Sequence, residues 1–346
     1  MSLEVRLCEA HEIGLVMKFL HEHWARDHVL SRDRALMDWQ HERPDGRYNF
    51  IVASRGSDSG LLAVLGFIPT SRYDPQLAEQ TVWLALWKVR PDAAAAGLGL
   101  AMLRHLTSMH GDSAVGVVGI GPAEHLGMYR ALRFATGHLS QHYMLNDSVT
   151  DFRIARVPVR PASGAPRSGG ASLRLLADDD LRDDGALARR LRDESAIPRK
   201  SARYFRSRFF NHPVYTYELY AVEAGDRAGI VATRLAVHEG RSALRIVDYL
   251  GSESLFGEIG EGVQELLQSA GAEYADVWNA GFSPSTFAEA GFAKVEPEGA
   301  IVIPNYFEPF LQRNGRISYA LRSTLSRPLA IFRADGDQDR PNEPGR

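Results

Sequence analysis

One order of predicted elements occurs twice along the chain, and this repeat constrains the fold more than any other feature. In the first half, an apolar strand at 81–89 precedes a glycine turn, a helix, a strand, a second helix and Phe134. In the second half the same order begins at Ala243 and ends at Phe292. The first and last residues are 53 positions apart in one stretch and 49 in the other, so any insertion in one stretch relative to the other is small. The pattern predicts two diverged copies of one α/β unit.

The length of the chain fits two such units. At 346 residues it exceeds one ordinary core and allows two domains of roughly 150 residues each. We predict a first domain at 1–150, a linker rich in Pro, Gly and Ser at 151–171, a second domain at 172–333 and a polar, disordered tail at 334–346. Each domain is expected to be α/β (α+β), with a mixed central sheet flanked by helices.

Composition excludes several classes of partner and of site. The 40 basic and 43 acidic residues give a net charge of -3, which offers no general attraction to nucleic acid or to an anionic membrane. No run of 18 apolar residues predicts membrane insertion, and no export signal is recognised. Cys8 is the only cysteine, so a reducing, cytoplasmic location is expected. No metal is predicted, since the histidines lack an H-E-x-x-H spacing.

The strongest local signal is a pair of glycines, Gly97 and Gly99, between the strand at 81–89 and the helix that follows. Glycines let a backbone approach an anion closely, and the free N–H groups of a first helical turn bind phosphate oxygens. The turn therefore indicates a pyrophosphate site. The alternative is that the glycines only end a strand and open a helix.

This turn resembles the Q/R-x-x-G-x-G/A motif of the GCN5-related N-acetyltransferase (GNAT) superfamily, with Ala94 where that family has Gln or Arg. The resemblance implies that acetyl-CoA or another acyl-CoA is bound as a substrate. The residues that it places at the coenzyme are Ala94, Ala96, Gly97, Leu98, Gly99 and Leu100.

A second segment carries the same resemblance. Residues 128–134, Met-Tyr-Arg-Ala-Leu-Arg-Phe, are similar to the family's Y-x-x-L-G-F stretch, with Arg133 in place of the glycine. In that family the tyrosine is the general acid that protonates the leaving thiolate, and the resemblance implies the same role for Tyr129. The alternative is a half-buried tyrosine that packs its helix on the sheet. The resemblance further implies that the preceding strand lines the thioester, through Leu86, Trp87, Lys88 and Val89.

The residue that accepts the proton of the attacking amine is less well indicated. The strand at 81–89 carries no carboxylate, and His28 is our candidate because histidine titrates near neutrality. His28 follows Trp24 by four positions, which would place both on one helical face. Surface or capping roles are the alternative for this histidine. Other candidates are His21, His23, Asp38, His41, Glu79 and His142.

The second copy differs at the positions that carry the chemistry. Glu258 and Glu261 stand in the segment aligned with the glycine turn, where they would repel a pyrophosphate, and Phe287 replaces Tyr129. We expect this copy to shape an acceptor cleft or a subunit contact, which leaves a homodimer open. Its polar residues would either grip the acceptor or form buried ion pairs: Arg234, Arg245, Asp248, Tyr274 and Asp276.

The predicted function is acyl-CoA-dependent N-acyltransfer, most simply N-acetyltransfer, to a small-molecule amine bound between the domains. Trp39-Gln-His41 and the stretch Ile-Pro-Asn-Tyr-Phe-Glu-Pro-Phe at 303–310 resemble acyltransferases of bacterial surface-polysaccharide and amino-sugar pathways, which favours an amino-sugar nucleotide. Two alternatives are an acyl-CoA sensor without catalysis and an aminoacyl-transferase of the FemABX type. The glycine turn argues against the latter, because such enzymes generally lack it.

Overall fold

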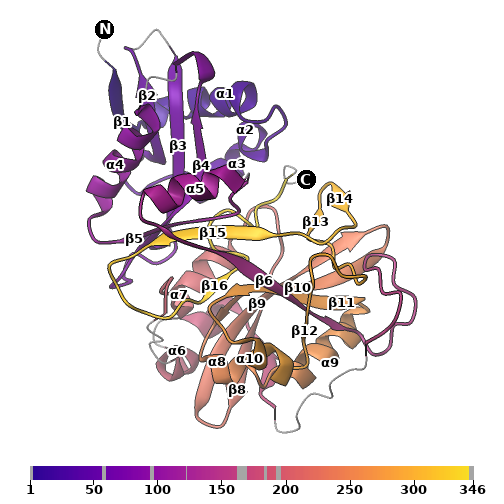
Figure 1. Ribbon diagram of the computed structural model, residues 1–346. Coiled ribbons are helices and arrows are strands. Elements are labelled where there is room, and N and C mark those ends of the chain that lie inside the picture. Colours follow the sequence, from indigo (N-terminus) through magenta and orange to yellow (C-terminus); the bar gives the residue numbers. More distant parts are fainter. Residues whose placement is uncertain are drawn as a thin grey trace.

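The strands of both halves join one continuous sheet. The computed structural model describes residues 3–56, 60–93, 97–121, 123–161, 170–182, 185–191 and 196–342. Within these residues the sheet runs β1-β2-β3-β4-β5-β15-β6-β11-β10-β9-β8-β7, with β12 added beside β6 and β16 beside β11 (Figure 1). A separate hairpin pairs β13 with β14.

The strands of the first half are β1 (Glu4–Cys8), β2 (Tyr48–Ser54), β3 (Leu61–Pro69), β4 (Thr81–Val89), β5 (Ala114–Val118) and β6 (Ala135–Leu145). Those of the second half are β7 (Ser172–Leu175), β8 (Glu218–Ala224), β9 (Arg227–His238), β10 (Arg241–Leu250), β11 (Tyr274–Ala280), β12 (Ala293–Lys294), β13 (Tyr306–Phe307), β14 (Phe310–Leu311), β15 (Ile317–Arg322) and β16 (Ile331–Phe332).

The helices of the first half are η1 (Ala10–Glu12), α1 (Ile13–His23), α2 (Val29–Arg32), α3 (Arg34–His41), η2 (Thr70–Arg72), η3 (Pro91–Ala93), α4 (Leu98–His110) and α5 (Ala123–Ala131). Those of the second half are η4 (Asp178–Leu181), α6 (Ala186–Arg190), α7 (Ala202–Phe205), the π-turn η5 (Arg206–Phe210), α8 (Glu253–Phe256), α9 (Gly260–Ala270) and α10 (Pro284–Glu289). No helix among the described residues has both the length and the apolar character needed to cross a membrane.

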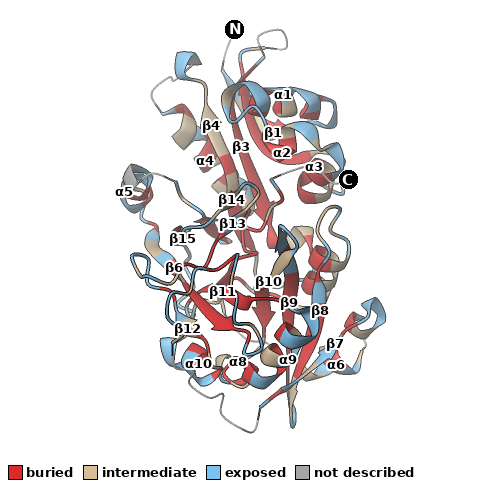
Figure 2. Ribbon diagram, turned by 90° about the vertical axis from the view of Figure 1, so that its right-hand side faces the viewer, coloured by how far each residue is buried: buried red, intermediate tan, exposed pale blue. Residues whose placement is uncertain are grey.

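Helices cover both faces of the first-half sheet. Alternate residues of β2 point to opposite sides: Phe50 and Val52 pack with α1, α2 and α3, whereas Ile51 and Ala53 pack with α4 and α5. Because both faces are covered, every residue of β2 and β3 is buried, and these strands are almost wholly apolar. Figure 2 shows these buried strands between helices whose outer faces are exposed.

Strand β6 connects the two halves of the sheet. Its first part, Ala135–Leu139, pairs with β15, and its second part, from Ser140 to Leu145, pairs with β11. β15 lies between β5 and β6, although it follows them in sequence by more than 170 residues. The predicted boundary at residue 150 therefore does not separate two independent sheets, because a strand from the C-terminal part completes the first one.

The prediction of a disordered tail is wrong for residues 334–342. Ala334, Asp335, Asp337 and Asp339 are buried, and Asp339 forms ion pairs with two arginines. The tail is polar because its carboxylates neutralise buried arginines of the second half, a role that composition does not distinguish from solvation. Residues 343–346, and residues 162–169 of the predicted linker, lie outside the described residues.

Candidate functional site

β4 and β5 separate where the candidate site begins. The two strands pair in parallel only as far as Leu84 on β4, although β4 continues to Val89. A β-bulge lies at the same point, with Ala85 as the extra residue opposite β3. A bulge bends its strand and increases the local twist. Within the described residues, the edge of β4 after Leu84 that faces β5 therefore has backbone groups available for a ligand.

The start of α4 is open to an anion. Gly97 precedes the helix as its N-cap, with φ of 90°, a left-handed conformation that favours glycine. Gly97 itself supplies no capping side chain, and the first turn of α4 contains no acidic residue. A Cβ at Gly97 would meet no atom of the described residues within 4 Å. The amides of Leu98, Gly99 and Leu100 are thus the uncapped donors of a first turn, which suit phosphate oxygens.

Three predicted site residues, Trp87, Gly99 and Tyr129, lie together on the face of the sheet that α4 and α5 cover. The indole of Trp87 lies over Gly99, where an added Cβ would approach Trp87 Cζ2 to 3.2 Å. It also meets the ring of Tyr129 edge to face, with centroids 6.4 Å apart. Burial raises the pKa of Tyr129 to about 12, so its hydroxyl is protonated at neutral pH. The arrangement places a proton donor on the same face as the start of α4.

Not every predicted lining residue faces this side. Val89 packs with Trp87 on the α4 face, but Leu86 is buried under the helices of the opposite face, and strand alternation directs Lys88 that way as well. Leu86 and Lys88 can therefore contribute backbone groups rather than side chains at the edge of β4. Ala94 and Ala96 lie outside the described residues.

The structure places His28 on the other face of the sheet from Tyr129. The predicted helix through this residue is wrong: α1 ends at His23, and His28 is the extended N-cap of α2. His28 is buried, neither ring nitrogen has a hydrogen-bond partner among the described residues, and burial lowers its pKa to about 3. Its ring is neutral at physiological pH and is a weak proton acceptor.

Most other candidate bases are engaged elsewhere. Their partners are Arg34 and Tyr48 for Asp38, the carbonyl of Phe67 for His41, Arg327 for Glu79, and a parallel stack on Phe287 for His142. Among the described residues, no group of three or more His, Cys, Asp or Glu side chains is placed to hold a metal ion.

The second half repeats the strand separation but fills it with its own chain. β10 and β11 pair in parallel only as far as Ile246, and Val247 is a bulge residue on β10, as Ala85 is on β4. β16 then pairs with the free part of β11, and the amide of Ala334 donates to the carbonyl of Val247 at 2.8 Å. At this separation, backbone groups of both β10 and β11 are thus bonded to another segment of the same chain.

The start of α9 is covered as well. Glu258 forms an ion pair with Arg227 at 2.7 Å, and its carbonyl accepts a hydrogen bond from the amide of Ala171. Glu261 adds a negative charge to the first turn of α9. An anion would meet the carboxylate of Glu261 and the chain at Ala171 at this end, in contrast to α4.

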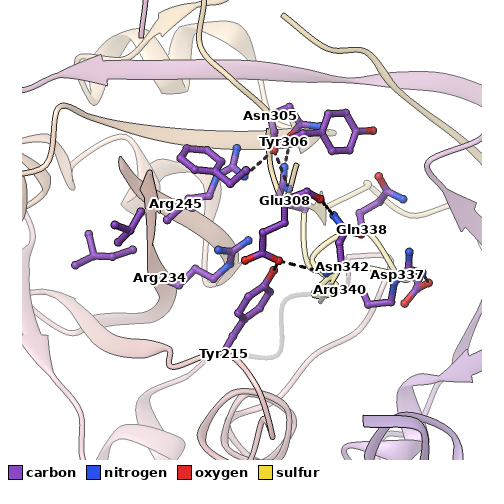
Figure 3. Close-up of a pocket in the computed structure, with 15 residues that line it drawn as sticks. Tyr215, Arg234, Arg245, Asn305, Tyr306, Glu308, Asp337, Gln338, Arg340 and Asn342 are labelled. Carbon is purple, nitrogen blue, oxygen red and sulfur yellow. Dashed lines mark hydrogen bonds and ion pairs between the residues drawn. The ribbon is translucent and has the colours of Figure 1, made fainter. Parts of the chain in front are cut away.

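A pocket lined by residues of the second half contains functional candidates that the sequence did not indicate, among them Tyr215, Gln338 and Arg340. It has a volume of about 390 Å³ and is lined by β9, the β13–β14 hairpin and tail residues 337–342 (Figure 3). Arg234, Tyr306 and Phe307, which the sequence did indicate, also line it, and Phe307 packs against a buried core as well. Arg245 is held by Asp276 at 3.0 Å, so that predicted pair is a buried ion pair. The alternating aspartates at 335, 337 and 339 were the available signal for a structured tail.

The fold has relatives of known structure, although no protein-family model and no curated protein matches the sequence. A GCN5-related N-acetyltransferase from Anabaena variabilis ATCC 29413 aligns with a TM-score of 0.53 and 11% identity, covering 93% of this chain and 72% of that one. A GCN5-related N-acetyltransferase from Kribbella flavida aligns with a TM-score of 0.52 and 12% identity, covering 93% of this chain and 71% of that one. A conserved Enterococcus faecalis V583 protein, described as a probable N-acyltransferase, aligns with a TM-score of 0.55 and 8% identity, covering 93% of this chain and 73% of that one.

These similarities extend over nearly the whole chain. The parallel β4–β5 pair separates beside an uncapped helix, with Tyr129 on the same face. At this identity the comparison establishes architecture rather than reaction. The chain has the fold of the GCN5-related N-acetyltransferases.

Proposed function

We propose that this protein is an acyl-CoA-dependent N-acyltransferase, most simply an N-acetyltransferase. The observation that carries the proposal is the unpaired edge of β4 after Leu84, together with the open first turn of α4. Pantetheine amides can pair with that edge as an added strand would, and the diphosphate can accept from the amides of Leu98, Gly99 and Leu100. The solved structures with the same fold support this assignment.

The proposed reaction is direct attack by a neutral amine on the thioester carbonyl. The amine nitrogen forms the new C–N bond, the C–S bond breaks, and the thiolate takes a proton from the hydroxyl of Tyr129. A pKa of about 12 keeps Tyr129 protonated until the thiolate forms. The proton that the amine loses passes to water, which returns a proton to Tyr129. The structure does not favour His28 for this role, because it is buried on the opposite face of the sheet and burial lowers its pKa to about 3. The first acceptor class to examine is an amino-sugar nucleotide.

In its described residues, the second half lacks the open strand edge and the open helix start of the first half, which supports a single coenzyme site per chain. Its equivalent strand edge is occupied by β16 and Ala334, and its helix start carries Glu258 and Glu261. We therefore assign coenzyme binding to the first half alone and acceptor binding to the region between the halves.

Native mass spectrometry with a series of acyl-CoA thioesters tests the proposal, followed by measurement of thiol release in the presence of amines. We expect one acyl-CoA per chain and release that depends on the amine. Retention of two molecules would contradict the assignment of one site, and retention of none would overturn the proposal. Binding without release for any amine would indicate an acyl-CoA sensor instead.

A further inference from the structure

The pocket of Figure 3, which we call the inner pocket, contains a buried arginine with donors to spare. The side chain of Arg234 is 8% exposed, and its Nε and Nη2 groups donate to Asp339 at 2.9 to 3.2 Å. Its guanidinium lies over the ring of Tyr215, 4.1 Å from the centroid. The Nη1 group makes no hydrogen bond to the described residues, although Arg234 lines the cavity. Nη1 is not among the solvent-inaccessible atoms that lack a partner, so it reaches the cavity, where an anionic ligand can accept from it.

The wall behind the inner pocket carries an excess of positive charge. Arg234, Arg245 and Arg333 are all at least nine-tenths buried, and among the described residues their carboxylate partners are Asp276 and Asp339. Asp339 is shared between Arg234 and Arg333. Burial lowers the pKa of Arg333, and the neighbouring Arg245 lowers it further. Three buried guanidiniums thus share two carboxylates, so this group of described residues carries a net charge of one positive unit.

A second cavity, the outer pocket, adjoins the inner one and extends the same character. It has a volume of about 700 Å³ and shares Tyr306, Glu308, Arg340 and Asn342 with the inner pocket. Its remaining charged residues are Arg26, Asp27, Arg32 and Arg313. Across both pockets the described residues supply seven arginines against Asp27, Glu308 and Asp337, with Asp276 and Asp339 behind the wall. Positive charge predominates.

The inner pocket is joined to the end of β5. Gln338 lines the pocket and donates through Nε2 to the carbonyl of Val118, the last residue of β5, at 3.2 Å. Asp337 lines it too and accepts from Gln40 of α3 at 2.9 Å. The same tail residues thus form a wall of the pocket and contact the strand that separates from β4.

We propose that the inner pocket binds the acyl acceptor and that this acceptor is an amine bearing a carboxylate or phosphate group, which Arg234 and Arg340 bind. The inference rests on the proposed function and specifies its substrate class. A guanidinium suits both anions because its N–H groups match two oxygens at once. Glu308, whose carboxylate faces Tyr215 and Asn342 at 3.4 Å, is available to the hydroxyl or ammonium groups of the same molecule (Figure 3).

Matched amine pairs test the acceptor class. Glucosamine 6-phosphate and glucosamine differ by a phosphate, whereas alanine and alaninamide differ by a carboxylate charge, so the two pairs distinguish the anions. We expect the anionic member of one pair to have a KM about tenfold or more below that of its neutral partner, with little change in kcat. Equal KM values within both pairs would overturn the inference and leave the proposed transferase intact.

Variants of the arginines test the location. Arg340→Gln removes the more accessible guanidinium, and Arg234→Gln removes the buried one. Each should reduce the preference for the anionic amine to about threefold or less, without changing acetyl-CoA binding. Arg174→Gln, which removes an exposed arginine on β7, is the matched control and should preserve the preference. If Arg234→Gln does not fold, the result for Arg340→Gln is decisive. An unchanged preference of that variant for the anionic amine would contradict the assignment of the anion to the inner pocket.

A binding measurement separates failure of this inference from failure of the proposed function. Inorganic phosphate, titrated calorimetrically into the full chain without coenzyme, should bind, and Arg340→Gln should weaken that binding about tenfold or more. Phosphate binding without transfer to any amine would retain the anion site and reject the transferase. If phosphate binding is absent or is the same in the variant, the anion site is rejected, whatever the transferase assays show.

Discussion

The carboxylate of Asp339 accepts hydrogen bonds from Arg234, 105 residues earlier in the chain, and both side chains are more than nine-tenths buried. Burial alone would raise the pKa of Asp339, but Arg234 and Arg333 hold it below its ordinary value. Through this carboxylate the last described segment of the chain is anchored to the sheet of the second half.

Replacing Asp339 should therefore destabilise the protein strongly. Asp339→Asn leaves two buried guanidiniums without a countercharge, which costs about 3–5 kcal/mol when a buried pair is broken. Urea unfolding of the variant and of the parent chain measures the loss. Asp147→Asn is the control, because it breaks an exposed pair with Arg160 that is worth about 1 kcal/mol or less. Similar losses in the two variants would contradict the structural role of the tail.

A negative charge in the first turn of α4 should weaken coenzyme binding without weakening the fold. Leu100→Asp and Leu100→Asn remove the same side chain, but only the aspartate repels a diphosphate. The aspartate also stabilises a helix start by about 0.3–1 kcal/mol, so lower stability cannot explain weaker binding. We expect acetyl-CoA to bind Leu100→Asp about tenfold or more weakly than Leu100→Asn, measured calorimetrically. Added salt should reduce this difference. Equal affinities would remove the phosphate site from α4.

Removing the hydroxyl of Tyr129 should separate chemistry from binding. A positioned general acid contributes about 10²–10⁴-fold, so Tyr129→Phe should lower kcat about 100-fold or more. The dissociation constant of acetyl-CoA should stay within about twofold, because the ring keeps its edge contacts with Trp87 and Phe134. Tyr319→Phe, on β15, is the control for loss of a hydroxyl. Normal turnover in Tyr129→Phe would show that this tyrosine only packs α5 on the sheet.

The buried histidines should make the protein less stable as the pH falls. Burial lowers the pKa of His142 to about 4, whereas an unfolded chain takes up this proton near pH 6.5. Protons therefore favour the unfolded state between these values, and His142 alone removes up to about 1.4 kcal/mol of unfolding free energy per pH unit. His142→Phe should reduce the slope of stability against pH from 6.5 to 4, measured by urea unfolding. The exposed His11, changed to Gln, should leave the slope unchanged.

The elements around the candidate site could be predicted because their signals are local. The change from strand to helical periodicity at Gly97 marks the end of one element and the start of the next, and the positive φ there is one that glycine adopts most readily. The substitution of Phe287 for Tyr129 and the acidic residues near α9 are equally visible in sequence. These patterns predicted the GNAT fold, which the solved structures confirm.

Other features were decided by contacts between distant segments. β15 reaches its place between β5 and β6 through pairing that no local pattern specifies, because a short strand of this kind has several possible neighbours. His28 lies outside the helix predicted for it, because α1 ends at His23 and Trp24 is its C-cap. The aspartates of the tail have the composition of a solvated segment, and only the position of Arg234 and Arg333 in the folded sheet makes them partners of buried charge. Local periodicity determined the elements, whereas the pairing of charges and strands across the chain determined the pocket.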